Sequence, residues 1–188
     1  MRAVTRLHAQ LSRFEDAFPG FRTEIVEGSV VACPLRPHHA GTVCAAWKAL
    51  GPQLGPEWDV VSDVAFPLDE DNEFSPDLAV IPAPEANRNA LAYPPDLIEL
   101  VVEVVSHGSI RRDYEVKPGR YASRGIANYL VLDPLKGHAV TMWNPGPDGY
   151  RGRDTIPYGP DLTIDSPLGK LQIPTAGLPV DPKARSQP

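Results

Sequence analysis

The sequence predicts a single α/β domain in which a mixed β-sheet is flanked by helices. The first observation is an apolar, valine-rich run at residues 97–105, which is typical of a central strand that is buried on both faces. The second is apolar residues at three- and four-residue spacing in residues 4–18 and 37–50, which is typical of surface helices. The 188 residues suit one domain. We assign residues 1–173 to it, and the proline-rich residues 174–188 to a loose tail.

Both predicted helices have apolar stripes and clear end signals. The stripe of the first helix consists of Val4, Leu7, Leu11, Phe14 and Phe18. Pro37 opens the second helix, and the glycine and proline at residues 51–52 end it. The stripe of this second helix is expected to consist of Val43, Trp47 and Leu50.

The predicted strands are short and separated by turn residues. Residues 21–26 and 29–32 predict a hairpin, because Gly28 in the two-residue connection permits positive φ. Further strands are expected at residues 59–66, 77–81 and 128–132, with an antiparallel extension of the sheet at residues 139–143, 150–156 and 171–173. An acidic loop within this series is expected to be solvated, and it contains Asp69, Glu70, Asp71 and Glu73.

The charge pattern argues against a uniformly basic nucleic-acid-binding protein. The formal net charge is −6. An acidic segment at residues 57–103 is followed by a basic one at residues 107–124. The longest apolar run is shorter than the ~18 residues of a membrane helix, and the N-terminus lacks the apolar block of a signal peptide. We therefore expect a cytoplasmic protein with no membrane partner.

A glutamate inside the most apolar strand needs an explanation. Glu103 must be protonated, paired with a cation or bound to a metal, because an isolated buried carboxylate is strongly destabilising. Asp77, at the start of another predicted strand, can supply a second oxygen ligand for a hard divalent cation. An arginine salt bridge or an exposed strand end are the alternatives for Glu103.

Four segments of the chain resemble the Uma-two family of restriction-endonuclease-like proteins. They are EIVEGSVV at residues 24–31, SPDLAV at residues 75–80, VEVVS at residues 102–106, and D-x3-K-x3-YA-x2-GI-x2-Y-x3-DP at residues 113–134. The resemblance spans about residues 20–145. It implies a nuclease core of the PD-(D/E)xK type and hydrolysis of DNA phosphodiester bonds.

The resemblance also implies a metal site. Asp77 takes the place of the aspartate of the pattern and Glu103 that of the glutamate. Together with Val104 they are the expected positions at a bound Mg²⁺ or Mn²⁺. Glu24 matches a recurrent family glutamate and is a further catalytic candidate, with an exposed hairpin glutamate as the alternative.

The lysine of the pattern is displaced in this chain. It normally follows the glutamate after one residue, where this sequence has Val105, and the resemblance offers Lys117 instead. Because proline disfavours helical geometry in the residue before it, we expect a short helix to begin at Pro118. Lys117 would then either reach Glu103 or form an ion pair with Asp113.

The basic segment and three histidines complete the candidate site. The expected phosphate-binding side chains are Arg111, Arg112, Arg120 and Arg124, with a solvated helix face as the alternative. His38, His39 and His107 have either a catalytic or metal-binding role, or a capping or surface role.

The leading hypothesis is a Mg²⁺- or Mn²⁺-dependent endonuclease with DNA as its partner. The alternative is a non-catalytic module, a homodimer or a nucleic-acid-binding unit, that keeps the nuclease fold.

Overall fold

The computed structural model describes residue 11 and residues 22–33 and 36–182. The elements before the central strand are β1 (Arg22–Val26), β2 (Ser29–Cys33), α2 (Pro37–Leu50), η1 (Gly51–Gln53), β3 (Trp58–Val61), β4 (Phe66–Pro67), β5 (Glu73–Phe74), β6 (Leu78–Pro82), α3 (Ala83–Ala86) and η2 (Pro95–Leu97). They are followed by β7 (Leu100–Val104), η3 (Arg112–Val116), α4 (Lys117–Ser123), β8 (Asn128–Asp133), β9 (His138–Gly146), β10 (Gly149–Pro157), β11 (Leu162–Ser166) and β12 (Gly169–Ile173). Of the first predicted helix only Leu11 is described, and the rest of that prediction lies outside the described residues.

A six-stranded mixed sheet organises the domain, in the order β10-β9-β8-β7-β6-β3. Only the β7–β8 pair is parallel, and every other neighbouring pair in this sheet is antiparallel. Strand β7 lies in the middle, and all of its residues are buried. The prediction of a mixed sheet with a central strand covered on both faces is therefore confirmed.

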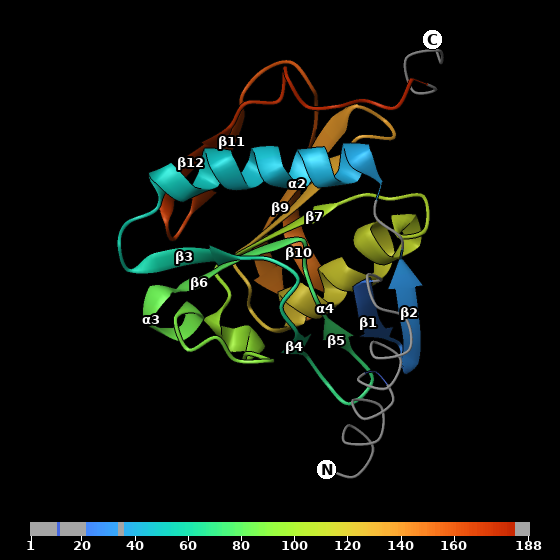
Figure 1. The fold of residues 1–188 in the computed structure, drawn as a ribbon, viewed down its shortest axis with the longest axis vertical. Coiled ribbons are helices and arrows are strands. Elements are labelled where there is room, and N and C mark those ends of the chain that lie inside the picture. Colours follow the sequence, from blue (N-terminus) through green and yellow to red (C-terminus); the bar gives the residue numbers. More distant parts are fainter. Residues whose placement is uncertain (1–10, 12–21, 34–35, 183–188) are drawn as a thin grey trace.

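The two faces of the sheet support separate hydrophobic cores, because side chains alternate between faces along each strand. Val101, Tyr129 and Val131 belong to one core, whereas Val102 and Leu130 belong to the other. Figure 1 shows helix α2 and the β11–β12 hairpin on one side of the sheet, and α4 with strands β1, β2, β4 and β5 on the other. Helices of the described part of the chain therefore flank the sheet on both faces, α2 on one and α4 on the other.

A second sheet, in the order β2-β1-β5-β4, lies beside α4. Its hairpin β1–β2 is confirmed, with Glu27 and Gly28 both at positive φ in the turn (48° and 72°). Strand β5 pairs Glu73 with Ile25 of β1. The prediction of a fully solvated acidic loop is wrong for Glu73. Its side chain is buried because β5 pairs with β1, whereas Asp69 is exposed.

Helix α2 has the predicted bounds but a different buried face. Its buried residues are His39, Thr42, Ala46 and Leu50. Val43 is only partly buried, and the prediction that Trp47 faces the core is wrong, since its side chain is 41% exposed. The way in which the helix crosses the sheet, rather than the spacing of its apolar residues, therefore decides which face is buried.

The C-terminal segment adds a two-stranded sheet, β11–β12, of which the sequence predicted only β12. In the segment expected to be a loose tail, Thr175 and Leu178 are buried. The Thr175 hydroxyl donates to the Pro160 carbonyl at 2.7 Å, so the described part of this segment packs on the domain. None of the helices in the described part of the chain has the length and hydropathy needed to span a membrane.

Candidate active site

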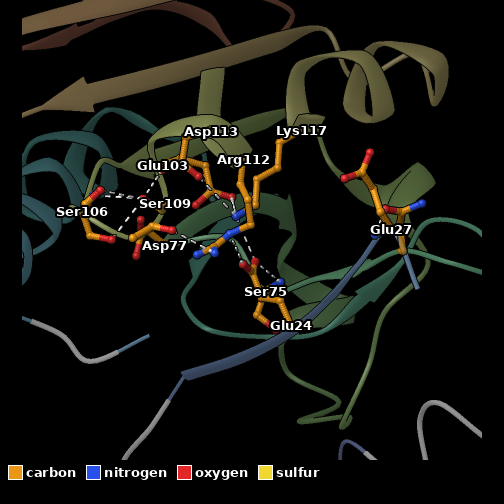
Figure 2. Close-up of polar contacts among 12 residues, drawn as sticks. Glu24, Glu27, Ser75, Asp77, Glu103, Ser106, Ser109, Arg112, Asp113 and Lys117 are labelled. Atoms are coloured by element: carbon orange, nitrogen blue, oxygen red, sulfur yellow. Dashed lines mark hydrogen bonds and ion pairs between the residues drawn. The ribbon is translucent and has the colours of Figure 1, made fainter. Parts of the chain in front are cut away.

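A cavity of ≈ 20 Å³ lies where β1, α2, β6, β7 and the η3–α4 helix meet. The charged and histidine side chains that line it are Glu24, His39, Asp77, Glu103, Arg112, Asp113 and Lys117. Figure 2 shows these acidic and basic side chains converging from separate strands and from the helix. The cavity is large enough for about one water-sized group.

Lys117 and Glu103 form the centre of this cluster. The Lys117 ammonium lies 2.8 Å from Glu103 Oε1, 2.9 Å from Glu24 Oε1 and 3.7 Å from Asp113 Oδ1. Lys117 is 1% exposed, so it both reaches Glu103 and pairs with Asp113, and the alternative of a surface ion pair is excluded. The hydroxyl of Tyr121 donates to Glu103 Oε1 at 3.1 Å, and burial, together with Glu103, raises the pKa of Tyr121 well above its ordinary value. Tyr121 therefore stays a proton donor that orients the carboxylate.

The local helix geometry explains how Lys117 enters the core. The prediction that the helix begins at Pro118 is wrong, because helical geometry starts before it and passes through the π-helical turn η3 into α4. In this turn the Lys117 N–H donates to the Arg112 carbonyl, five residues earlier. A proline ring normally clashes with the carbonyl four residues before it, and the wider turn relieves this contact. Pro118 is thus accommodated inside a continuous helix, and Lys117 faces the sheet.

Asp77 lies immediately before β6, beside the end of β7. Its Oδ2 accepts a hydrogen bond from the backbone N–H of Val104 at 2.7 Å, and its Oδ1 lies 3.2 Å from His39 Nε2. The side chain is buried, so both oxygens are held in fixed directions. Asp77 and Glu103 are therefore anchored to neighbouring strands and face the same cavity.

Glu24 is buried on β1, which excludes the alternative of an exposed hairpin glutamate. Its Oε1 accepts the backbone N–H of Ser75 at 3.0 Å in addition to the contact with Lys117. Its Oε2 lies 3.8 Å from Arg112 Nε. Glu24 therefore joins the second sheet to the two cations of the site.

Asp113 is a component that our sequence reasoning treated only as a pairing partner. It is buried, and its Oδ2 accepts a hydrogen bond from the Ser109 hydroxyl. Burial raises the pKa of Asp113 to about 6, and this effect outweighs the opposing attraction of Lys117. The four-residue spacing between Asp113 and Lys117, which places both on one helix face, is the signal in the sequence that identifies it.

The described lining of the cavity is rich in carboxylates. Among these residues, four carboxylates (Glu24, Asp77, Glu103 and Asp113) accompany two side chains that are always cationic, Lys117 and Arg112. Carboxylate oxygens are the ligands that hard divalent cations prefer.

The four candidate arginines do not form one surface. Only Arg112 lines the cavity, and its guanidinium also donates to the Gly108 carbonyl at 3.0 Å. Arg111, Arg120 and Arg124 are exposed, and each lies near a carboxylate, of Glu27, Asp69 and Asp96 respectively.

The three histidines line one neighbouring cavity of ≈ 210 Å³, but only His39 also contacts the site, through Asp77. His38 and His107 are exposed. In the described part of the chain, no three His, Cys, Asp or Glu side chains are grouped to hold a metal ion.

Comparisons with known proteins agree with this fold. The model of the Uma2 family, described as "Putative restriction endonuclease", matches residues 8–176. A crystal structure described as a putative nuclease belonging to DUF820 from Anabaena variabilis superposes with a TM-score of 0.62 at 14% sequence identity, covering 84% of this chain and 88% of that chain. The comparison with curated proteins found no match.

Proposed function

The chain belongs to the Uma2 family, and on that premise we propose that it is a metal-dependent endonuclease that hydrolyses DNA phosphodiester bonds. The observation that carries the proposal is the single cavity into which Asp77, Glu103 and Lys117 all project. Two carboxylates and a buried ammonium are the groups that metal-assisted phosphodiester hydrolysis requires.

The side chains of the cavity fit a hard divalent cation. Asp77 and Glu103 provide carboxylate oxygens, and Val104, which follows Glu103 at the end of β7 and also lines the cavity, provides a backbone carbonyl as a further oxygen ligand. The cavity has room for about one water-sized group. We therefore infer that Asp77 and Glu103, with Val104, hold Mg²⁺ or Mn²⁺. A cation held there supplies Lewis-acid catalysis.

The other side chains have distinct tasks in this proposal. Lys117 places a positive charge 2.8 Å from Glu103, where it can stabilise negative charge that develops on a scissile phosphate. Glu24 and Glu103 both form an ion pair with Lys117, so Glu24 helps to fix the direction of its ammonium. The Tyr121 hydroxyl, one turn after Lys117 on the same helix, donates to the same oxygen of Glu103 and orients the carboxylate.

One observation favours the alternative of a non-catalytic nucleic-acid-binding module. Lys117 already compensates the charge of Glu103, as a salt bridge would in a site that has lost its chemistry. The two functions make different predictions about turnover, because only the enzyme needs an ionised Glu103 that coordinates a metal.

The test is cleavage of plasmid and oligonucleotide DNA in Mn²⁺ by the wild type, Asp77→Asn and Glu103→Gln. Asp165→Asn is the matched control, because that carboxylate is 82% exposed on β11 and pairs with Lys170. We expect cleavage by the wild type and the control, and a loss of about 10²-fold or more in the two site variants. Absence of cleavage with retained DNA binding would support the binding module.

A further inference from the structure

A groove of ≈ 470 Å³ runs along helix α2 and opens directly beside the candidate active site. We call it the α2 groove; its lining includes His39, Val43, Trp47, Lys48, Asp63 and Asp77. His39 and Asp77 line both this groove and the catalytic cavity. Its volume lies in the range of about 300–1,000 Å³ that is typical of small-molecule sites. Whatever occupies the groove therefore also reaches the site.

Three side chains form a stripe along the groove. His39, Val43 and Trp47 are spaced by four residues, so they share one face of α2. Eight residues of helix at about 1.5 Å each place Trp47 roughly 12 Å along the axis from His39. The groove thus extends from the candidate active site to the indole of Trp47, which is 41% exposed.

The opposite wall is fixed in place. Asp63 has positive φ (54°), and its backbone N–H donates to the Pro76 carbonyl at 3.1 Å. Pro76 directly precedes Asp77, so the wall and the proposed metal ligand belong to one hydrogen-bonded unit. The groove is therefore a preformed feature of the fold.

The described lining of the groove suits a planar occupant. It includes one ammonium, of Lys48, and two carboxylates, of Asp63 and Asp77. A phosphate deep in the groove would lie near these carboxylates, whereas a nucleobase would lie against Val43 and the exposed indole of Trp47. Bases stack on aromatic side chains with little dependence on sequence, and they can do so only when they are unpaired.

We propose that the α2 groove binds an unpaired nucleotide of the substrate strand, with its base stacked on Trp47. This inference rests on the proposed function, and it makes the substrate a single strand or a locally opened duplex. Lys48, at the same wall, contacts the phosphate of that nucleotide at the mouth of the groove.

Trp143 provides a matched control. It is exposed to a similar degree, 43%, but it lies on β9 and does not line the α2 groove or the catalytic cavity. Its indole covers Gly152 of the neighbouring strand, where an added Cβ would clash with the ring. It is therefore a second accessible indole at a different place on the domain.

The experiment measures binding of a fluorescein-labelled oligo(dT) strand in EDTA, where metal-dependent cleavage cannot occur, by the wild type, Trp47→Ala, Trp47→Phe and Trp143→Ala. Loss of one stacked base should weaken Trp47→Ala by about 5- to 150-fold. Trp47→Phe should retain most of the affinity and Trp143→Ala all of it. A blunt duplex should bind more weakly than the strand, with little dependence on Trp47.

The outcomes separate this inference from the proposed function. Equal affinity of wild type and Trp47→Ala for the strand, equal losses at Trp47 and Trp143, or no binding by the wild type would overturn the inference. Cleavage in Mn²⁺ by a protein whose binding does not depend on Trp47 would overturn the inference alone. Trp47-dependent binding without any cleavage would support the groove and contradict the endonuclease.

Discussion

Replacing Lys117 by methionine should destabilise the fold strongly, because the cation lies between three buried carboxylates. Methionine keeps the unbranched stem and removes the charge that lies 2.8 Å and 2.9 Å from Glu103 and Glu24. Removing one partner of a buried ion pair costs about 3–5 kcal/mol, since the remaining charge is left uncompensated. We expect a decrease of this size in the free energy of unfolding at pH 7.

The assay is equilibrium unfolding in urea, with Lys170→Met as the control. Lys170 pairs with Asp165 at 3.6 Å, but both side chains are largely exposed, so its loss should cost only about 0–1 kcal/mol. The deficit of Lys117→Met should shrink at pH 5, because the carboxylates that lose their cation can then take up protons.

A double-mutant cycle with Glu103→Gln keeps the reasoning testable if Lys117→Met alone unfolds. The second substitution removes one of the uncompensated charges, so the double variant should be more stable than the sum of the single effects predicts. Equal small losses for Lys117→Met and Lys170→Met, with no coupling to Glu103, would refute the assignment of Lys117 to the buried cluster.

Three further predictions concern metal, pH and DNA. Saturating Mn²⁺ should raise the melting temperature of the wild type and of Asp165→Asn but not of Asp77→Asn. Equal shifts in all three proteins would show that Asp77 is not a metal ligand. The pKa of Asp113 is raised to about 6, so this group stabilises the fold below its unfolded value of 3.8 and loses that contribution as pH rises through about 6. Wild-type stability in urea should therefore fall relative to Asp113→Asn by up to about 3 kcal/mol across this window, and a constant difference would contradict it. If Arg111, Arg120 and Arg124 contact phosphates, each Ala variant should reduce the salt dependence of DNA binding by about one unit of slope, whereas unchanged slopes would assign them to the solvated surface.

The sequence was most informative where a local pattern determines the structure. The run at residues 97–105 predicted the central strand, since β-branched residues on both faces suit only a strand covered on both sides. Glu27-Gly28 predicted the hairpin turn for a similarly local reason. The structure also brings Asp77, Glu103 and Lys117 to one cavity. A partner for Glu103 such as Asp77 was expected because a buried carboxylate needs one, whereas Lys117 was expected only from the family resemblance.

What the sequence could not reveal depends on non-local pairing. Strands β4 and β5 have two residues each, too few for a period, so the burial of Glu73 followed only from its pairing with Ile25. Trp47 obeys helical spacing, but the crossing of α2 over the sheet decides which stripe is buried. The π-helical turn before Pro118 likewise has no signature in residue spacing, because it arises from the fit between helix and sheet.

That turn lets the helix hold one extra residue without loss of register. In it the Lys117 N–H bonds to the carbonyl five residues earlier, whereas an α-helix would use the carbonyl four residues earlier. Deleting one residue between Arg112 and Lys117, such as the exposed Glu115, would turn this bond into an ordinary α-helical one and leave the helical segments on either side in nearly the same phase. Lys117 and Tyr121 would then still face Glu103, but Pro118 would lose the wider turn that accommodates its ring. The extra residue therefore accommodates the proline, and a one-residue deletion there should lower the stability of the fold more than it disturbs the orientation of the cation.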